Sequence, residues 1–222
     1  MTVGNDIVDL RDPESVPASL HGRYLERVFT AHERLAILDR PDPVELWSRW
    51  AAKEAAYKAL AGDRPPGQPE LVFSPRAFVT ELDPPGAGPH RDGWVLHSDQ
   101  DLALPVRVHC LDGAVHAVAT TERDVLDRTR VVTAAFRLDE VRLGEAEIDR
   151  PSLAVRRAAR RHLAQNLGCD VRRVKICGRR PPRFVLDGQL AAASLSLSHH
   201  GDWVAYAFSH AQVAAAQLGA RA

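Results

Sequence analysis

The chain has 222 residues, 45% of them hydrophobic and 26% charged, a composition that excludes a disordered chain, a collagen and a small disulfide-bonded scaffold. Its 29 basic and 29 acidic residues give a net charge of zero, which excludes a polycation drawn to nucleic acids or membranes by overall charge. No apolar run approaches the roughly 20 residues that span a bilayer, and the N-terminus lacks the regions of a signal peptide. We therefore expect a cytoplasmic protein with no membrane partner.

The first predicted element is a short strand, Val3 to Leu10, which carries carboxylates at Asp6 and Asp9 and ends before a turn signal. The residues Thr30-Ala-His-Glu33 have the spacing of a capping box, so we expect a helix to begin after Thr30. The apolar side of that helix is assigned to Leu35, Ile37 and Leu38.

The next predicted element is a longer helix, from about Pro43 to Ala61, with apolar residues near helical spacing and a stop at Gly62. Glu54 and Lys58 lie four residues apart on this helix and therefore share a face. The following segment is rich in Pro and Gly and indicates strands joined by a long loop, with a short apolar stretch at Leu71 to Phe73. Three further strands are expected, at Trp94 to His97, Val106 to Cys110 and Val115 to Thr120.

A charged stretch at residues 121–129 is the best linker and divides the chain into residues 1–125 and 126–222. The second part is expected to repeat the plan of the first, with a strand at 131–138, a helix at 152–167 and strands at 171–177, 194–198 and 203–208. The segments His109 to Val118 and His199 to Phe208 also resemble each other, since both place a histidine and a turn before a strand. We therefore predict an α+β fold: a monomeric pseudo-dimer of two related halves, each a small, mainly antiparallel sheet packed on helices.

Lysine is rare in this chain, because 26 of the 29 basic residues are Arg. Two of the three lysines, Lys53 and Lys58, nevertheless lie within six residues, on either side of Glu54. Asp6, Asp9 and Glu54 form the kind of oxygen-ligand set that magnesium uses together with substrate phosphates, and the two lysines can neutralise phosphate oxygens beside such a metal. The alternative is that Glu54 and Lys58 form only an exposed helical ion pair.

Between Arg156 and Arg183 the chain has nine arginines and Lys175 but a single acid, Asp170. A solvated helix face would normally mix the signs of its charges, so a polyanionic ligand is the better explanation. The first four arginines can bind a phosphate remote from the metal: Arg156, Arg157, Arg160 and Arg161. A nucleic-acid-binding module is an alternative from another class, but few aromatic residues are interleaved for base stacking, so we expect no nucleic-acid partner.

The segment Ser194 to Gly201 alternates Leu and Ser and places His199 at a turn. It lacks the nucleophile elbow of a serine hydrolase. From the residues alone, Ser198 and His199 are better explained as a hydrogen-bonded strand end than as a catalytic pair.

Three segments together resemble the signature regions of the 4'-phosphopantetheinyl transferases, namely Gly4 to Leu10, Trp47 to Lys58 and Ser196 to Phe208. The resemblance implies a magnesium-dependent enzyme that moves the phosphopantetheine arm of coenzyme A onto a serine of an apo acyl or peptidyl carrier protein, and releases adenosine 3',5'-bisphosphate. Such carriers serve fatty-acid, polyketide or nonribosomal-peptide synthesis, and the sequence does not distinguish among them. Surfactin-type members are pseudo-dimers with the site between the halves; here the metal-binding half comes first, so the order of the halves is swapped.

The same resemblance implies roles for individual residues. Asp6 and Glu54 would bind the metal, Lys53 and Lys58 the phosphates, and Ser198 with His199 the nucleotide end of coenzyme A. Glu54 would also be the base for the acceptor hydroxyl. Asp9 or water would complete the metal ligands, because Val8 stands where an acid is common in the surfactin type. The arginines expected to contact coenzyme A are Arg156, Arg157, Arg180 and Arg183. A non-catalytic homologue that only docks carrier proteins is the remaining alternative.

Overall fold

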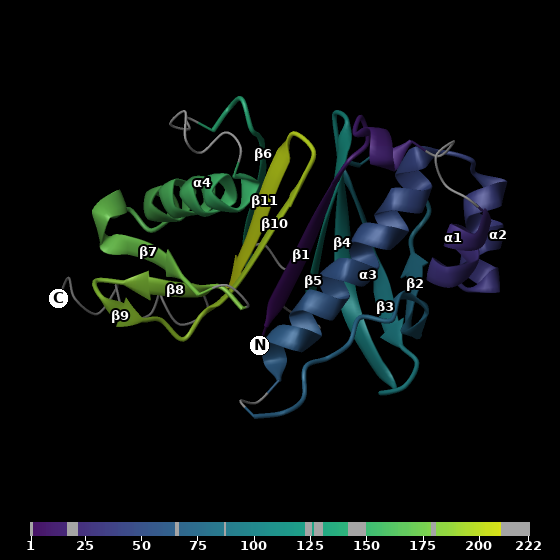
Figure 1. The fold of residues 1–222 in the computed structure, drawn as a ribbon, viewed down its shortest axis with the longest axis horizontal. Coiled ribbons are helices and arrows are strands. Elements are labelled where there is room, and N and C mark those ends of the chain that lie inside the picture. The colour runs from purple at the N-terminus through teal and green to yellow at the C-terminus, as the bar shows by residue number, and fades with distance from the viewer. Residues whose placement is uncertain are drawn as a thin grey trace.

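The computed structural model describes residues 2–16, 22–64, 67–86, 88–122, 126, 131–141, 150–178 and 181–209. Figure 1 shows two parts side by side, with strand β1 (Val3–Asp9) of the first part next to strand β10 (Ser194–His200) of the second. Each part packs helices on antiparallel strands, so the predicted α+β class is confirmed. Among the described residues, no helix is long and apolar enough to cross a membrane.

The first part is a five-stranded antiparallel sheet in the order β1-β5-β4-β3-β2, with the long helix α3 packed along it (Figure 1). Most of the predicted helices and strands are present, at slightly different bounds. The elements that follow β1 are η1 (Pro13–Ser15), α1 (Gly22–Val28), α2 (Ala31–Asp39), α3 (Pro43–Asp63), η3 (Pro75–Ala77), β2 (Phe78–Leu82), β3 (His90–His97), β4 (Leu102–Leu111) and β5 (Ala114–Thr120).

The predicted capping box at the start of α2 is confirmed, because the Thr30 side chain accepts from the Glu33 amide and the Glu33 carboxylate accepts from the Thr30 amide. The apolar side assigned to α2 is wrong in part. Ile37 is buried, but Leu35 and Leu38 are 67% and 68% exposed. The expected strand at residues 71–73 is absent, since these residues lie in an irregular segment before η3.

Helix α3 and strand β1 approach each other closely because small residues line the contact. Five alanines of α3 are fully buried, and a Cβ added to Gly4 would lie 2.0 Å from the Ala55 carbonyl oxygen and 2.4 Å from the Ala59 nitrogen. Only glycine fits such a backbone-to-backbone contact. Side chains two residues apart on a strand share a face, so Gly4 brings Asp6 against the same helix.

We expect Gly4→Ala to destabilise the fold and to separate Asp6 from α3, because the new methyl group meets backbone atoms rather than a flexible side chain. Overpacking of this kind typically costs about 1–3 kcal/mol. Gly62→Ala is the matched control on α3, where an added Cβ would meet only Thr2 at 3.8 Å. Urea unfolding of both variants measures the difference, and equal stabilities would contradict the proposed close contact.

The second part contains a three-stranded antiparallel sheet in the order β10-β11-β6, covered by helix α4, and a smaller sheet in the order β7-β8-β9 (Figure 1). Its predicted elements are again present, and β8 and β9 are additional. Their bounds are β6 (Val131–Arg137), α4 (Pro151–Asn166), η6 (Val171–Arg173), β7 (Val174–Cys177), β8 (Arg183–Leu186), β9 (Gln189–Leu190) and β11 (Trp203–Ser209).

The two parts share a connectivity. In the first part, helix α3 precedes the hairpin β4-β5, and β5 pairs with the first strand, β1. In the second part, helix α4 precedes the hairpin β10-β11, and β11 pairs with the first strand, β6. The similar segments noted in the sequence form the corresponding hairpins, β4-β5 and β10-β11. This topology is compatible with two related halves. Most of the predicted linker lies outside the described residues, so the division at residue 125 stays a prediction.

Side chains of β10 accept hydrogen bonds from backbone amides on the outer edge of β1, which would otherwise lack partners. The two strands face each other at a constant offset of 191 residues, and three amides of β1 donate to β10: Val3 to Ser194 Oγ at 3.0 Å, Asn5 to Ser196 Oγ at 3.0 Å, and Asp9 to His200 Nδ1 at 3.2 Å. Val3 and Ile7 pack against residues of both sheets. The two parts are therefore tightly joined along β1.

Candidate active site between the two parts

Asp6, Glu54 and Lys58 form one cluster. The Lys58 Nζ lies 2.7 Å from Asp6 Oδ1 and 3.7 Å from Glu54 Oε2. The three side chains are partly buried, with exposed fractions of 13% for Asp6, 21% for Glu54 and 30% for Lys58. Strand β1 and helix α3 thus bring together both carboxylates expected to bind the metal and one of the lysines expected to bind phosphate.

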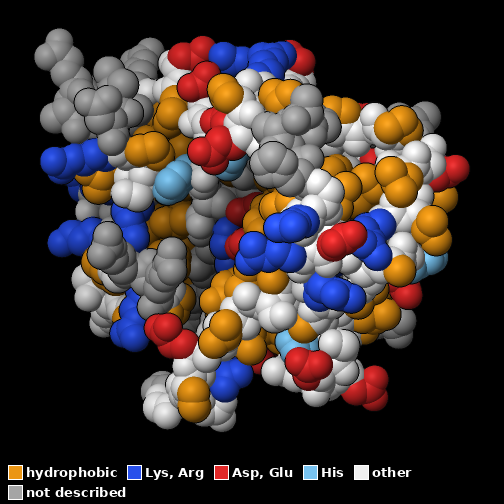
Figure 2. Space-filling view, turned by 45° about the vertical axis from the view of Figure 1, so that its right-hand side comes forward, with side chains coloured by type: hydrophobic (Ala, Val, Ile, Leu, Met, Phe, Trp, Pro, Cys, Tyr) orange, Lys and Arg blue, Asp and Glu red, His pale blue; other side chains and the backbone are white. Residues whose placement is uncertain are grey.

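His199, near the end of β10, is a residue of the second part of the molecule that interacts electrostatically with this cluster. Burial of part of its ring lowers the pKa of His199 below the usual value, and the nearby Lys58 ammonium lowers it further, while Asp6 opposes the change. His199 therefore lies within electrostatic range of the Asp6 and Lys58 side chains. Figure 2 shows a hollow in one face of the molecule, with basic and acidic side chains next to each other at its margin.

Ser198 lies next to His199 but faces the interior. It is 5% exposed, and its Oγ accepts a hydrogen bond of 2.8 Å from Asn5 Nδ2. The same amide nitrogen lies 3.1 Å from His116 Nε2, and the Asn5 Oδ1 is buried without a hydrogen-bond partner among the described residues. Contact between Ser198 and a nucleotide stays a prediction; in this structure its hydroxyl joins the two parts.

The stability of the protein should depend on the neutral state of His116. Burial, together with His109 and Lys58, lowers the pKa of His116 to about 3, whereas an unfolded histidine titrates near 6.5. Between these values the unfolded chain binds one more proton, so the free energy of unfolding should fall as the pH falls, by up to about 1.4 kcal/mol per pH unit.

Urea unfolding at several pH values from 6.5 to 4 measures this dependence. In His116→Gln the amide can still accept from Asn5 but does not titrate, so its stability should fall less steeply than that of the wild type. Parallel curves for the two proteins would contradict the assignment.

Lys53 does not join the cluster but pairs with groups inside the protein, and its expected role as a phosphate ligand stays a prediction. Its side chain is fully buried, and Nζ lies 2.8 Å from Glu33 Oε1 and donates to the carbonyl oxygens of Pro75 and Phe78. Glu33 also accepts from the Thr80 amide and hydroxyl. Every position around the ammonium is taken by an internal partner, so Lys53 joins α2, α3 and the start of β2.

Asp9 is also placed apart from the cluster. It lies three residues beyond Asp6, on the opposite face of β1 and about 10 Å along the strand. Its buried carboxylate accepts from the amides of Arg11 and Asp202, both at 2.9 Å. Asp9 therefore fixes the turn after β1 to the β10-β11 turn. Its expected part in completing the metal ligands stays a prediction.

A different set of side chains gathers near this turn. Asp12, Glu14 and His200 place their ligand atoms within 4.8 Å of one another. The His200 Nδ1 is already used by the Asp9 amide, however, and exposed acidic groups are common without an ion. This group does not replace Asp6 and Glu54 as the candidate metal site.

Tyr24 of α1 interacts electrostatically with Glu54, which the sequence did not reveal. Its ring contacts Trp47 and Trp50 of α3, with centroid separations of 6.4 and 6.1 Å. Burial raises the pKa of its hydroxyl, and the negative charge of Glu54 raises it further. Tyr24 thus packs on α3 within electrostatic range of Glu54. No pattern predicted α1, which is a helix of only seven residues.

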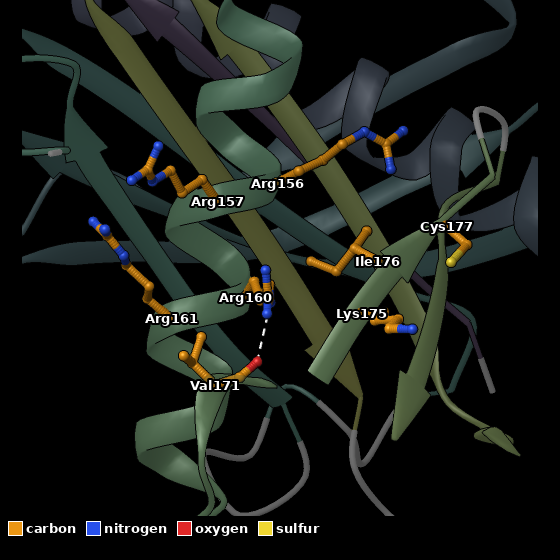
Figure 3. Close-up of a pocket in the computed structure, with 8 residues that line it drawn as sticks. All are labelled: Arg156, Arg157, Arg160, Arg161, Val171, Lys175, Ile176 and Cys177. Carbon is orange, nitrogen blue, oxygen red and sulfur yellow. Dashed lines mark hydrogen bonds between the residues drawn. The ribbon is translucent and has the colours of Figure 1, made fainter. Parts of the chain in front are cut away.

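The arginine-rich segment forms a basic cavity of about 640 Å³ between α4 and β7. Figure 3 shows that Arg156 points toward the β7 side of α4, whereas Arg157 and Arg161 point to the other side. Arg156 donates to the Gly178 carbonyl at 2.7 Å and Arg160 to the Val171 carbonyl at 3.0 Å (Figure 3 draws the second). Arg183 is exposed on β8, and Arg180 lies outside the described residues.

Comparison with known proteins identifies the family. The model of the 4'-phosphopantetheinyl transferase superfamily matches residues 2–117, just over half of the chain. The holo-[acyl-carrier-protein] synthase of Protochlamydia amoebophila is 41% identical over 59 residues, which cover 26% of this chain and 48% of that protein. The enzyme of the same name from Azorhizobium caulinodans is 35% identical over 104 residues, which cover 39% of this chain and 76% of that protein.

No solved structure matches the chain. The matched residues 2–117 contain Asp6, Glu54 and Lys58. On the strength of this match the chain belongs to the 4'-phosphopantetheinyl transferase superfamily.

Proposed function

We propose that the protein transfers the 4'-phosphopantetheine arm of coenzyme A to a serine of an apo acyl or peptidyl carrier protein, with magnesium, and releases adenosine 3',5'-bisphosphate. The observation that carries the proposal is the contact of Asp6 and Glu54 with one ammonium group, Lys58, inside the matched region. The two relatives described above are named holo-[acyl-carrier-protein] synthases.

The residues of the cluster fit a magnesium ion. Magnesium is usually held by one or two carboxylates together with substrate phosphates, and here two carboxylates from different elements already surround a cationic group. When bound, the ion would polarise the pyrophosphate and offset charge that develops on it. Asp6 and Glu54 would hold it, with the remaining positions left to phosphate and water.

The transfer itself is a displacement at phosphorus. The serine oxygen of the carrier forms a bond to the phosphorus that bears the pantetheine arm, the bridging pyrophosphate bond breaks, and adenosine 3',5'-bisphosphate leaves with the bonding electrons. We assign to Glu54 the removal of the serine proton, and to Lys58 the stabilisation of negative charge on the phosphates. His199 is assigned to the nucleotide end of coenzyme A, with Ser198 holding the strand below it. In this scheme residues 1–125 form the metal-binding half and residues 126–222 the nucleotide-binding half.

Arginines of the basic segment, some of which line the cavity between α4 and β7, are proposed to bind the 3'-phosphate of coenzyme A. Arg156, Arg157, Arg180 and Arg183 remain the assigned residues; Arg156 and Arg183 come near each other at Gly178, where an added Cβ would lie 3.8 Å from Arg183 Cγ.

We expect Arg156→Ala combined with Arg183→Ala to raise the KM for coenzyme A at least tenfold, because a charge-assisted contact is worth about 1.5–3 kcal/mol. The KM for dephospho-coenzyme A, which lacks the 3'-phosphate, should change little. Arg172→Ala is the control, since Arg172 is exposed and pairs with Asp170. Equal losses for both substrates would place the 3'-phosphate elsewhere.

The proposed function is tested by incubating the purified chain with apo carrier proteins, coenzyme A and magnesium, followed by intact-mass measurement. We expect the carrier to gain the mass of one phosphopantetheine group, and to gain none when magnesium is chelated. If no carrier of a broad panel is modified, the proposal fails. Tight, strongly salt-dependent binding of unrelated duplex DNA in the absence of coenzyme A binding would favour the nucleic-acid alternative instead.

A further inference from the structure

We propose that Lys58 acts as a resident counter-cation, which holds the Asp6 and Glu54 carboxylates together and hinders metal binding until a phosphate ligand draws the ammonium away. Metal and coenzyme A would then bind cooperatively rather than independently. The inference rests on the proposed function, because it assumes that the two carboxylates are the metal ligands.

The Lys58 ammonium contacts the same two carboxylates that would bind the metal, so the two cations compete for them. Asp6 and Glu54 come from different elements and approach each other in a partly buried place, where like charges repel and need a compensating cation. Lys58 supplies that cation at 2.7 and 3.7 Å. A divalent ion bound by the same two carboxylates would stand against the Lys58 charge, so the ammonium must first move.

Lys58 is suited to such a movement, whereas Lys53 is not. Lys53 is fully buried and held by Glu33 and two backbone carbonyl oxygens. Lys58 is 30% exposed, its contact with Glu54 is long, and its four-carbon stem is flexible. The phosphates of an incoming ligand offer the ammonium new oxygen partners and at the same time leave the carboxylates free for the metal.

Thermodynamic linkage makes this coupling reciprocal. If coenzyme A raises the affinity for metal by some factor, metal must raise the affinity for coenzyme A by the same factor. Removal of the Lys58 charge should therefore have two effects: metal should bind more tightly without any phosphate ligand, and the coupling between metal and coenzyme A should shrink.

The experiment is calorimetric titration of the 222-residue chain with magnesium alone, comparing wild type, Lys58→Met and Lys58→Arg. Lys58→Met removes the charge but keeps an unbranched stem of similar length, and we expect it to bind magnesium at least tenfold more tightly than the wild type. Lys58→Arg keeps the charge and should bind about as weakly as the wild type. Adding Asp6→Asn to Lys58→Met should abolish the gain. Thermal unfolding establishes that each variant is folded, and Lys58→Gln replaces Lys58→Met if the latter is not.

A second titration measures coenzyme A affinity with and without magnesium, and the ratio of the two affinities should be at least tenfold larger in the wild type than in Lys58→Met. Unchanged or weaker magnesium binding by both uncharged variants would overturn the inference, even where the wild type modifies carrier proteins. Tighter binding that depends on Asp6 would support it, and that readout does not require transfer activity. The failure of the proposed function, which is an unmodified carrier, is thus distinguishable from the failure of this inference.

Discussion

Asp6→Asn and Glu54→Gln should each lower kcat for carrier-protein modification by about 10²–10⁴-fold, because loss of a metal ligand removes several kcal/mol of transition-state stabilisation. Both substitutions remove a negative charge while keeping a side chain of nearly the same size. The fold should survive, since both side chains are partly exposed and each substitution keeps the shape of the side chain. Steady-state kinetics with saturating coenzyme A measure the effect.

The double variant gives the sharper result. If both carboxylates act through one ion, Asp6→Asn combined with Glu54→Gln should be scarcely slower than either single variant, because residues that act as a unit are not additive. Asp12→Ala is the control, since Asp12 belongs to the other acidic group and should leave kcat unchanged. Near-normal magnesium-dependent turnover in either single variant, or full additivity of the two, would contradict a shared metal site.

The sequence predicted the elements of this fold well where local patterns carry the information. The capping box at Thr30, the long helix from Pro43 and the hairpin strands follow from residue spacing. Periodicity could not show that Leu35 and Leu38 of α2 face solvent, because it finds an apolar side without showing what packs against it. The short helix α1 was missed, since seven residues hold too little pattern.

The cluster at Lys58 could be predicted in its membership but not in its arrangement. The carboxylate and lysine residues were chosen by chemistry and by resemblance, and the structure brings Asp6, Glu54 and Lys58 together, with His199 within electrostatic range. The displacement of Asp9 follows from strand geometry, which places residues three apart on opposite faces. Its partner, the Asp202 amide, lies 193 residues away, and no local pattern identifies a contact of that range.

The burial of Lys53 was foreseeable from the sequence in one respect. Leu46, Arg49, Lys53, Ala56 and Leu60 follow one another at spacings of three and four residues, which places all five on one face of α3. Every one of them is buried in the structure. The helical pattern therefore places Lys53 in the interior. Its neighbour Glu54 lies on a different face of the helix, so a role for Glu54 in the site does not imply one for Lys53. What the pattern cannot supply is the partner, Glu33, on a different helix.

Lys53→Met should consequently lower the free energy of unfolding by about 3–5 kcal/mol, the usual cost of removing one partner of a buried ion pair. Burial alone would raise the pKa of Glu33, but Lys53 and the surrounding hydrogen bonds hold it below its usual value, so Glu33 keeps its charge in the folded protein. Without Lys53 that charge is buried and poorly compensated. Adding Glu33→Gln to Lys53→Met should restore part of the lost stability, because the orphaned charge is then removed as well.

Two measurements separate this structural role from phosphate binding. Urea unfolding should show the loss of stability in Lys53→Met and little change in the control Lys175→Met, whose lysine is exposed on β7. At a temperature where the variant remains folded, its affinity for coenzyme A should match that of the wild type, because the Lys53 ammonium faces Glu33 and two carbonyl groups rather than the cluster at Lys58. A Lys53→Met variant of normal stability with weakened coenzyme A binding would instead show that Lys53 binds the phosphates. The contact between Lys53 and Glu33 would then have to break when the ligand binds.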